Sequence, residues 1–210
     1  MKKLLLSMIL FAGILGLSAT SSATEVDNGD GTKTVDGTGS TSIPVTGTLG
    51  ADNTKEDGGI PEGSTQWVNV VVPSKTIFYS LPGATTIQSP TYTVKNQSGR
   101  PVTVDIASFN AVDETAISGT NLSVSLNATG ATESSVTAST SVISSAAAVG
   151  TLNTKLADLA NVNNRFTSAG AAVSGANQLS FSYGGTLTAV NTQKIGTYNL
   201  MLSFSVPTNW

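Results

Sequence analysis

Apolar and polar residues alternate along much of the chain after residue 66, and this period of two is typical of strands with one buried face. Three such runs predict strands at residues 67–72, 75–80 and 91–95. Four more predicted strands have their apolar positions at Val102, Val104 and Ile106; at Leu122, Val124 and Leu126; at Leu179, Phe181 and Tyr183; and at Tyr198, Leu200, Leu202, Phe204 and Val206. These runs favour an all-β fold over one that alternates strands with helices.

Turn residues divide the alternating runs at short intervals. Pro73 cannot donate a backbone hydrogen bond, so we expect a strand to end there. Residues 96–100 (NQSGR) predict a turn, and Gly184-Gly185 predicts a tight hairpin into a further strand at residues 186–190. Short strands joined by such turns indicate an antiparallel β-sandwich of the Ig-like or jelly-roll-like kind.

One segment has helical spacing instead. Leu152, Leu156 and Leu159 recur at intervals of four and three in the run LNTKLADLANV. This spacing predicts one short helix of two or three turns. We expect it to cap one end of the sandwich or to cross between its sheets.

The first 23 residues have the pattern of a secretory signal peptide. Two lysines precede a mostly apolar stretch at residues 4–17, and small residues follow it. We expect cleavage after Ala23, with Ala19 and Ser21 as alternatives. The apolar stretch is shorter than the roughly 18–20 residues that span a bilayer, so we expect a secreted chain with no membrane span after signal removal.

The rest of the chain divides by composition. Residues 24–40 are rich in Gly, Asp and Thr, which predicts a flexible acidic leader. Residues 42–49 (SIPVTGTL) predict a short first strand, and residues 50–63 a polar loop. The expected organisation is a signal peptide at 1–23, the leader, and one β-sandwich domain at 41–210.

The chain contains no cysteine and no histidine. It therefore lacks the commonest general base, the commonest metal ligand and the thiolate nucleophile, and no disulfide stabilises it. Carboxylates are sparse after residue 62, and Asp105 is the one that lies well within a predicted strand. A carboxylate pair for glycoside hydrolysis is therefore not indicated. We expect a protein that is not an enzyme and has no cofactor and no metal site.

Charge is unevenly distributed. Residues 24–62 hold eight acidic and two basic residues, whereas residues 63–210 hold five acidic and six basic residues. The chain has no polybasic segment, so nucleic acid is not an expected partner. A nearly neutral body rich in Ser and Thr suits contact with a glycan or with another protein.

The two tryptophans, Trp67 and Trp210, are the candidate partner contacts. Trp67 lies on the face of its predicted strand opposite Val68 and Val70, so we expect partial exposure and contact with a sugar ring or a protein partner. The alternative for Trp67 is a second core face, as in a central strand of a sandwich.

Exported β domains without cysteine sometimes carry an isopeptide crosslink between a lysine and an asparagine on adjacent strands, with a buried carboxylic acid between them. The candidates are Lys75 or Lys95 with Asn199, and Asp105 as the acid. The alternative is that both lysines are ordinary solvated side chains.

Four segments carry a resemblance to a known group, in this order: SIPVTGTLG, VNVVVPSKTIFY, SPTYTVKNQSGRPVTVDIASF and TYNLMLSFSVP. Together they resemble small secreted proteins of Gram-positive bacteria that are encoded with WxL-domain surface proteins. Neither Trp67 nor Trp210 is part of a Trp-x-Leu motif, so the peptidoglycan binding attributed to those motifs does not carry over. The resemblance implies a location in the cell envelope, no covalent anchor, and multi-protein surface complexes.

Two functions fit these observations. The first is non-catalytic binding at the cell surface, to a cell-wall polymer or to an anchored surface protein. The second is adhesion by self-assembly, with the chain as the homo-oligomeric subunit of a surface fibre or biofilm matrix. In the second case residues 24–40 or residues 42–49 would complete the sheet of a neighbouring copy by strand addition.

Overall fold

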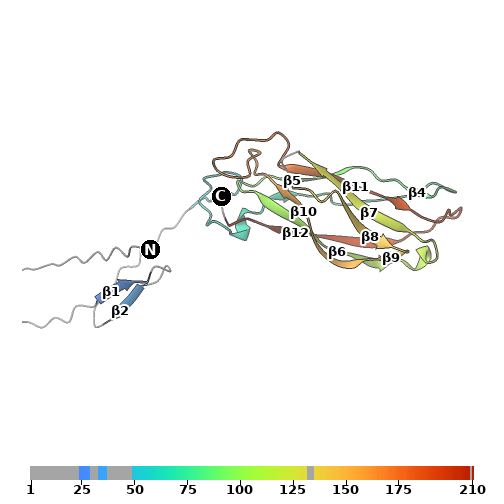
Figure 1. Cartoon of the computed structure of the whole chain (residues 1–210), viewed down its shortest axis with the longest axis horizontal. Helices are drawn as coiled ribbons and strands as arrows, with labels where there is room; N and C mark the ends of the chain where they lie inside the picture. The colour runs from blue at the N-terminus through green and yellow to red at the C-terminus, as the bar shows by residue number, and fades with distance from the viewer. Residues whose placement is uncertain (1–23, 29–32, 37–48, 132–134, 209) are drawn as a thin grey trace, which may run out of the picture. The chain divides into compact units, whose positions relative to one another are not determined.

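The computed structural model describes residues 24–28, 33–36, 49–131, 135–208 and 210, and the chain forms two compact units, Met1–Gly47 and Thr48–Trp210 (Figure 1).

In the first unit, β1 (Thr24–Asp27) pairs antiparallel with β2 (Lys33–Asp36). This hairpin was not predicted, because residues 24–40 were expected to be a flexible leader. The predicted signal peptide with its cleavage site at Ala23 lies outside the described residues. So does the predicted strand at residues 42–49, except for Leu49.

The second unit is built from two antiparallel sheets, which confirms the all-β, sandwich-like prediction (Figure 1). The smaller sheet has three strands in the order β10 (Gly150–Leu159), β6 (Val102–Asp113) and β12 (Thr197–Ser205). The larger sheet has seven strands. Its order is β3 (Val70–Val71), β5 (Tyr92–Asn96), β11 (Gln178–Thr186), β7 (Ser123–Gly130), β8 (Ser139–Ser144) and β9 (Ala147–Ala148), and β4 (Thr86–Ile87) also pairs with β11. The helices among the described residues are the 3-10 turns η1 (Thr65–Trp67) and η2 (Thr115–Ile117).

The alternating residues build the core between these sheets. Val102, Val104 and Ile106 of β6 are fully buried, whereas Thr103 and Asp105 between them are half-buried on the other face of that strand. The same alternation buries apolar residues of β5, β7 and β11 in one continuous cluster with those of β6. Burying each large aliphatic side chain contributes about 1.5–3 kcal/mol, so these strands supply most of the driving force for folding.

The helix predicted from Leu152, Leu156 and Leu159 is wrong, because these residues belong to β10. The pairing of β10 with β6 shifts register twice, between Thr151 and Thr154 and between Lys155 and Ala157. Such a bulge adds one residue to a strand, so apolar positions at odd spacing can face the same core. Leu156 and Leu159 are both fully buried in this way, and their spacing imitates that of a helix.

The strands predicted at residues 67–72 and 75–80 are largely absent. The first shrinks to the two residues of β3. In the second, the backbone of Ile77 bonds to a side chain rather than to a strand: the hydroxyl of Tyr92 accepts from its N–H at 2.7 Å and donates to its carbonyl at 3.3 Å. Pro73 lacks an N–H at the start of this segment and limits strand pairing there.

The hairpin predicted at Gly184-Gly185 is also wrong, because β11 runs straight through both glycines. Gly185 pairs with Val124 of β7 on one side and with Ile87 of β4 on the other. A Cβ atom on Gly185 would lie 1.9 Å from the carbonyl oxygen of Ser123. Gly185 is therefore required by the close approach of two backbones and not by a turn.

We expect Gly185→Ala to lower the free energy of unfolding by about 2 kcal/mol, because the backbone of β7 must move away from the new methyl group. This corresponds to a fall in Tm of about 4–8 °C for a domain of this size. The matched control is Gly184→Ala, whose Cβ would meet only the flexible end of the Asn127 side chain, at 2.8 Å. Thermal unfolding followed by circular dichroism measures both variants, and equal losses would contradict this explanation.

Candidate functional site

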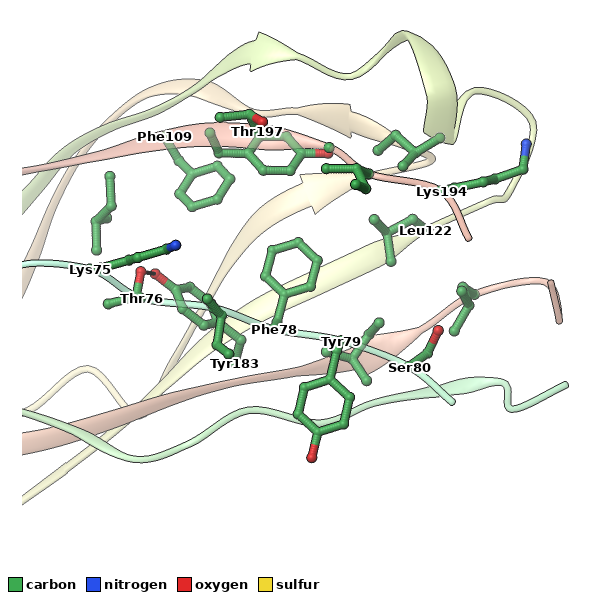
Figure 2. A pocket seen from close by; sticks show the side chains of 18 of the residues that line it. Lys75, Thr76, Phe78, Tyr79, Ser80, Phe109, Leu122, Tyr183, Lys194 and Thr197 are labelled. Carbon is green, nitrogen blue, oxygen red and sulfur yellow. Dashed lines mark hydrogen bonds between the residues drawn. The ribbon is translucent and has the colours of Figure 1, made fainter. Parts of the chain in front are cut away.

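A groove of about 1070 Å³ lies on the side of the sandwich where β12 has no neighbouring strand (Figure 2). One wall is formed by residues 72–82, which run beside the larger sheet, and the other by residues 190–200, which lead into β12 and form its first part. Core side chains of both sheets form its floor, among them Phe109 and Tyr183. We call this feature the groove.

Aromatic rings line the floor of the groove and connect the two sheets (Figure 2). Tyr198 of β12 stacks on Phe109 of β6 with ring centroids 5.1 Å apart. Phe78 bridges from the wall to both sheets, 5.7 Å from Tyr183 and 6.0 Å from Tyr198. Such ring pairs contribute about 0.5–1.5 kcal/mol beyond the burial of their area, so the groove has a preformed floor.

The inward face of β12 is incompletely covered. Tyr198, Leu200, Leu202 and Phe204 all point toward the core, yet each is half-buried, whereas the corresponding residues of β6 are fully buried. Their partial exposure means that apolar area along β12 is still available for contact with a further chain segment.

The polar residues of the groove are mostly neutral Ser, Thr, Asn and Gln side chains, and most of them lie on its two walls. The charged residues that line it are Lys75 and Lys194, and no described carboxylate lines it. The hydroxyl of Tyr198 is buried with no hydrogen-bond partner among the described residues. Burial, together with the negative charge of Glu114, raises the pKa of Tyr198 to about 12, so it stays a neutral phenol at physiological pH.

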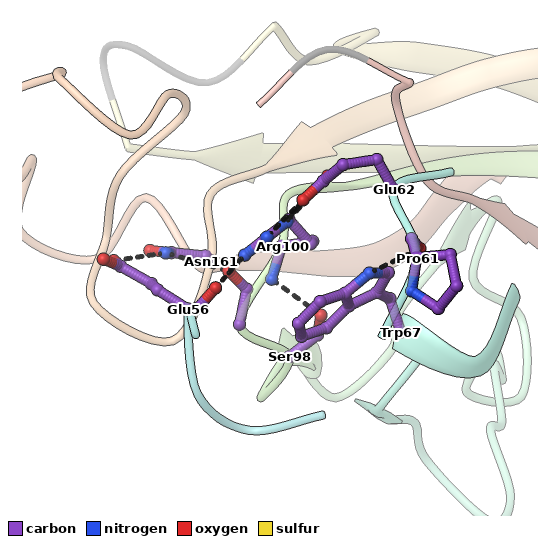
Figure 3. A network of polar contacts seen from close by, with 8 residues as sticks. Glu56, Pro61, Glu62, Trp67, Ser98, Arg100 and Asn161 are labelled. Carbon is purple, nitrogen blue, oxygen red and sulfur yellow. Dashed lines mark hydrogen bonds and ion pairs between the residues drawn. The ribbon is translucent and has the colours of Figure 1, made fainter. Parts of the chain in front are cut away.

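A second cluster surrounds Arg100, the last residue of the predicted turn at residues 96–100 (Figure 3). Its guanidinium lies 4.2 Å from the ring centre of Trp67 and 5.0 Å from that of Trp210. Nε donates to both carboxylate oxygens of Glu62 at 3.1 and 3.0 Å, and the Nη2 group pairs with the same carboxylate. The planar guanidinium is thus stacked and paired at once, which lysine cannot reproduce.

Glu56 extends this cluster to the loop after β10. Its side chain accepts from Asn161 at 2.7 Å and from Asn163 at 3.0 Å, and it pairs with Arg165 at 3.7 Å. Its backbone carbonyl accepts from Arg100 at 2.6 Å. We call Arg100, Trp67, Trp210, Glu62, Glu56 and Asn161 the Arg100 cluster. It ties the loop at residues 51–67, the turn before β6 and the loop after β10 together.

The Arg100 cluster holds both of its glutamates ionised. Hydrogen bonds from Asn163 and Asn161 lower the pKa of Glu56 below its ordinary value of 4.5. The hydrogen bond from Arg100 lowers the pKa of Glu62 in the same way. A carboxylate with donors fixed around it is stabilised as the charged form, so acid weakens this part of the fold.

The prediction for Trp67 is wrong, because its side chain is 0% exposed and cannot contact a partner. Trp67 belongs to η1 rather than to a strand, and its indole N–H donates to the carbonyl of Pro61 at 3.0 Å. It is not part of a second core face either, since it packs under Arg100 at the end of the sandwich. Trp210 is half-buried beside Arg100, and its role as a partner contact stays a prediction.

The residues proposed for an isopeptide crosslink do not assemble. Lys95 is exposed on β5 of the larger sheet, whereas Asn199 is exposed on β12 of the smaller sheet. Lys75 and Asn199 both line the groove but are both exposed. Asp105 lies on the outer face of β6, where its cross-strand neighbours are Lys155 and Ser203. No buried acid therefore separates a lysine from the asparagine.

Neither the groove nor the Arg100 cluster was predicted from the sequence. The groove depends on which strand is left at a sheet edge, and the alternation of β12 does not reveal this. The Arg100 cluster had one available signal: the chain contains two arginines, and Arg100 is at the centre of the cluster while Arg165 pairs with its Glu56. In a chain so poor in charge, an arginine beside a Gly-containing turn indicates a fixed polar contact.

Comparison with family models, curated proteins and solved structures finds no match to this chain. Among the described residues, no helix has the length and apolar character that a bilayer crossing requires.

We expect Arg100→Lys to lower the free energy of unfolding by about 3 kcal/mol, because it leaves the two-ring stack and the forked pair with Glu62 incomplete. The matched control is Arg165→Lys, because this arginine is partly exposed and pairs with Glu56 at 3.7 Å, so its replacement is expected to cost less than about 1 kcal/mol. Urea unfolding at neutral pH measures both. Equal and small losses would show that the Arg100 cluster does not stabilise the domain.

The lowered pKa values of Glu56 and Glu62 predict a loss of stability in acid. Both glutamates contribute fully to the free energy of unfolding above their ordinary pKa of 4.5. This contribution disappears as pH falls below that value toward the pKa in the folded state. We expect Tm to fall over this range in the wild-type chain, and to fall less in Glu62→Gln. The control is Asp57→Asn, an exposed neighbour that should leave the slope unchanged, and a Glu62→Gln slope equal to that of the wild type would contradict the assignment.

Proposed function

We propose that this chain is a non-catalytic binding protein of the bacterial cell surface, and that the groove is its binding site for an extended segment of a protein partner. The observation that carries the proposal is the combination of an apolar groove with the free edge of β12. An edge strand offers backbone donors and acceptors, and a row of alternate apolar positions beside it offers contacts for alternate side chains of an added strand.

The chemistry of the groove favours a protein partner over a wall polymer. Its floor carries Leu, Ile, Phe and Tyr side chains, whereas the neutral Ser, Thr, Asn and Gln side chains lie mainly on its two walls. The polar walls alone would also suit a glycan, but the apolar floor beside the free edge of β12 favours an extended peptide, which is held by the backbone of β12 and by apolar contacts.

The location and the lack of catalysis rest on the sequence. The first 23 residues carry the pattern of a secretory signal, and the four segments that resemble Gram-positive surface proteins support a setting in the cell envelope. The absence of histidine and cysteine supports a binding role over a catalytic one.

We expect the purified chain to sediment with cell walls of the bacterium that produces it, and to lose this property when the walls are first treated with protease. The test variant is Leu202→Glu, which places a charge on the half-buried wall of the groove. The matched control is Met201→Glu on the outer face of the same strand, where the side chain is 58% exposed.

Leu202→Glu should lose sedimentation and Met201→Glu should retain it, with circular dichroism confirming that both are folded and a sample without walls correcting for self-sedimentation. Binding that survives protease treatment of the walls and is indifferent to Leu202→Glu would replace the protein partner with a wall polymer.

A further inference from the structure

We propose that the segment that fills the groove is residues 42–49 of a second copy of this chain, added as a strand along the free edge of β12. This inference rests on the proposed function, because it names the occupant of the same groove. It makes the chain a self-assembling subunit in which each copy offers both a groove and a strand.

The first argument is that β12 is a long edge without protection. It has nine residues (TYNLMLSFS) with no charged residue and no proline, and it pairs with β6 on one side. The two register shifts in that pairing place the extra residue in β6 and not in β12. Natural sheets guard such edges with charges, prolines, bulges or a covering segment. An unguarded edge of this length is a template for another strand.

The other edges among the described residues differ from β12. The opposite edge of the smaller sheet, β10, is covered by residues 135–137, which bond to it through Thr137 N to Leu156 O at 2.8 Å and Asp158 N to Ser135 O at 3.0 Å. The outer strands β3 and β9 of the larger sheet have two residues each. Among the described edges, the long and unprotected one is therefore β12, the strand that lines the groove.

The second argument is the pattern of the proposed donor strand. In SIPVTGTL the apolar residues Ile43, Val45 and Leu49 stand at odd positions, and all four even positions are Ser, Thr or Pro. In a strand, residues of equal parity share one face and direct their backbone groups to one side. When the odd residues face the groove and bond to β12, Pro44 directs its ring nitrogen away from β12, where a missing N–H costs no ladder hydrogen bond.

The third argument is the match of length and charge. Eight extended residues span about 26 Å, close to the length of about 30 Å for the nine residues of β12. The charged side chains that line the groove are Lys75 and Lys194, whereas the 17 residues that precede the donor in the chain hold four carboxylates and one lysine. Opposite charges at the two partners favour docking and direct the approach.

The donor is assigned to a second copy because of Leu49. This residue is 99% exposed, so the last apolar residue of the segment makes no apolar contact with its own domain. Since the groove and the donor are different surfaces, the contact is head-to-tail and continues into an open chain of subunits rather than a closed dimer.

The experiment compares the chain from residue 24 to residue 210 with three variants of it by light scattering after size exclusion, over a range of concentrations. The wild-type chain is expected to form dimers and larger species whose proportion rises with concentration. The donor variant Ile43→Asp/Val45→Asp and the acceptor variant Leu202→Glu should each lose these species and run as monomers. The control Thr46→Asp, a charge on the other face of the donor, should retain them.

Mixing gives the decisive measurement. The donor variant keeps an intact groove and the acceptor variant keeps an intact donor strand, so an equimolar mixture of the two is expected to form a one-to-one complex that does not grow further. A mixture that stays monomeric overturns the proposal. So does a wild-type chain that is monomeric at every concentration, which would indicate that the donor folds back on its own groove or stays unbound.

A synthetic peptide of residues 41–50 supplies a measurement that does not depend on the folding of a variant. We expect the fluorescently labelled peptide to bind the donor variant, whose groove is vacant, and the Ile43→Asp/Val45→Asp peptide to lose this binding. Absence of binding by the native peptide overturns the proposal. Should self-assembly fail while sedimentation with walls still depends on Leu202, the groove remains a binding site and only its occupant is wrong.

Discussion

The unequal width of its two sheets is the constraint on which the rest of this structure depends. Neighbouring strands lie about 4.8 Å apart, so a sheet of three strands covers a narrower strip than a sheet with six strands side by side. The apolar residues of β5, β7 and β11 are covered where β6 lies above them, and the core is fully buried there. Beyond β12 no strand continues the smaller sheet, so Tyr198, Leu200 and their neighbours stay half-buried and the groove results.

The Arg100 cluster complements the groove. It fixes the loop at residues 51–67 against the domain, through Arg100 with Glu62 and through the bond from Gly99 N to Asn53 O at 2.7 Å. A Cβ atom on Gly99 would lie 2.1 Å from the carbonyl oxygen of Lys55, so the two backbones are in direct contact. The chain that follows the proposed donor strand is therefore anchored, and a pull on one subunit is transmitted to the end of the sandwich rather than into a loose loop.

The sequence predicted the fold class and the strands that bury one face, because a period of two reports burial directly: β5, β6, β7, β11 and β12 all follow it. The prediction failed where another interaction took the place of regular hydrogen bonding between strands. The bulges of β10 imitated helical spacing, the Tyr92 hydroxyl took the place of a strand beside Ile77, and Gly185 served a close backbone contact rather than a turn. The sites were harder to predict, because Arg100 meets Glu62 and Trp210 across long stretches of chain, and the groove follows from strand order.

The tryptophans and tyrosines are divided between the Arg100 cluster and the groove. Both tryptophans lie against Arg100, whereas Tyr79, Tyr183 and Tyr198 line the groove and Tyr92, the fourth tyrosine of the chain, stacks on its floor. Indole emission can be excited at wavelengths where phenols do not absorb. The unlabelled chain thus carries an optical reporter at one end of the sandwich that is chemically distinct from the rings at the other site, so loosening of the loop and filling of the groove can be followed as separate events in the same sample.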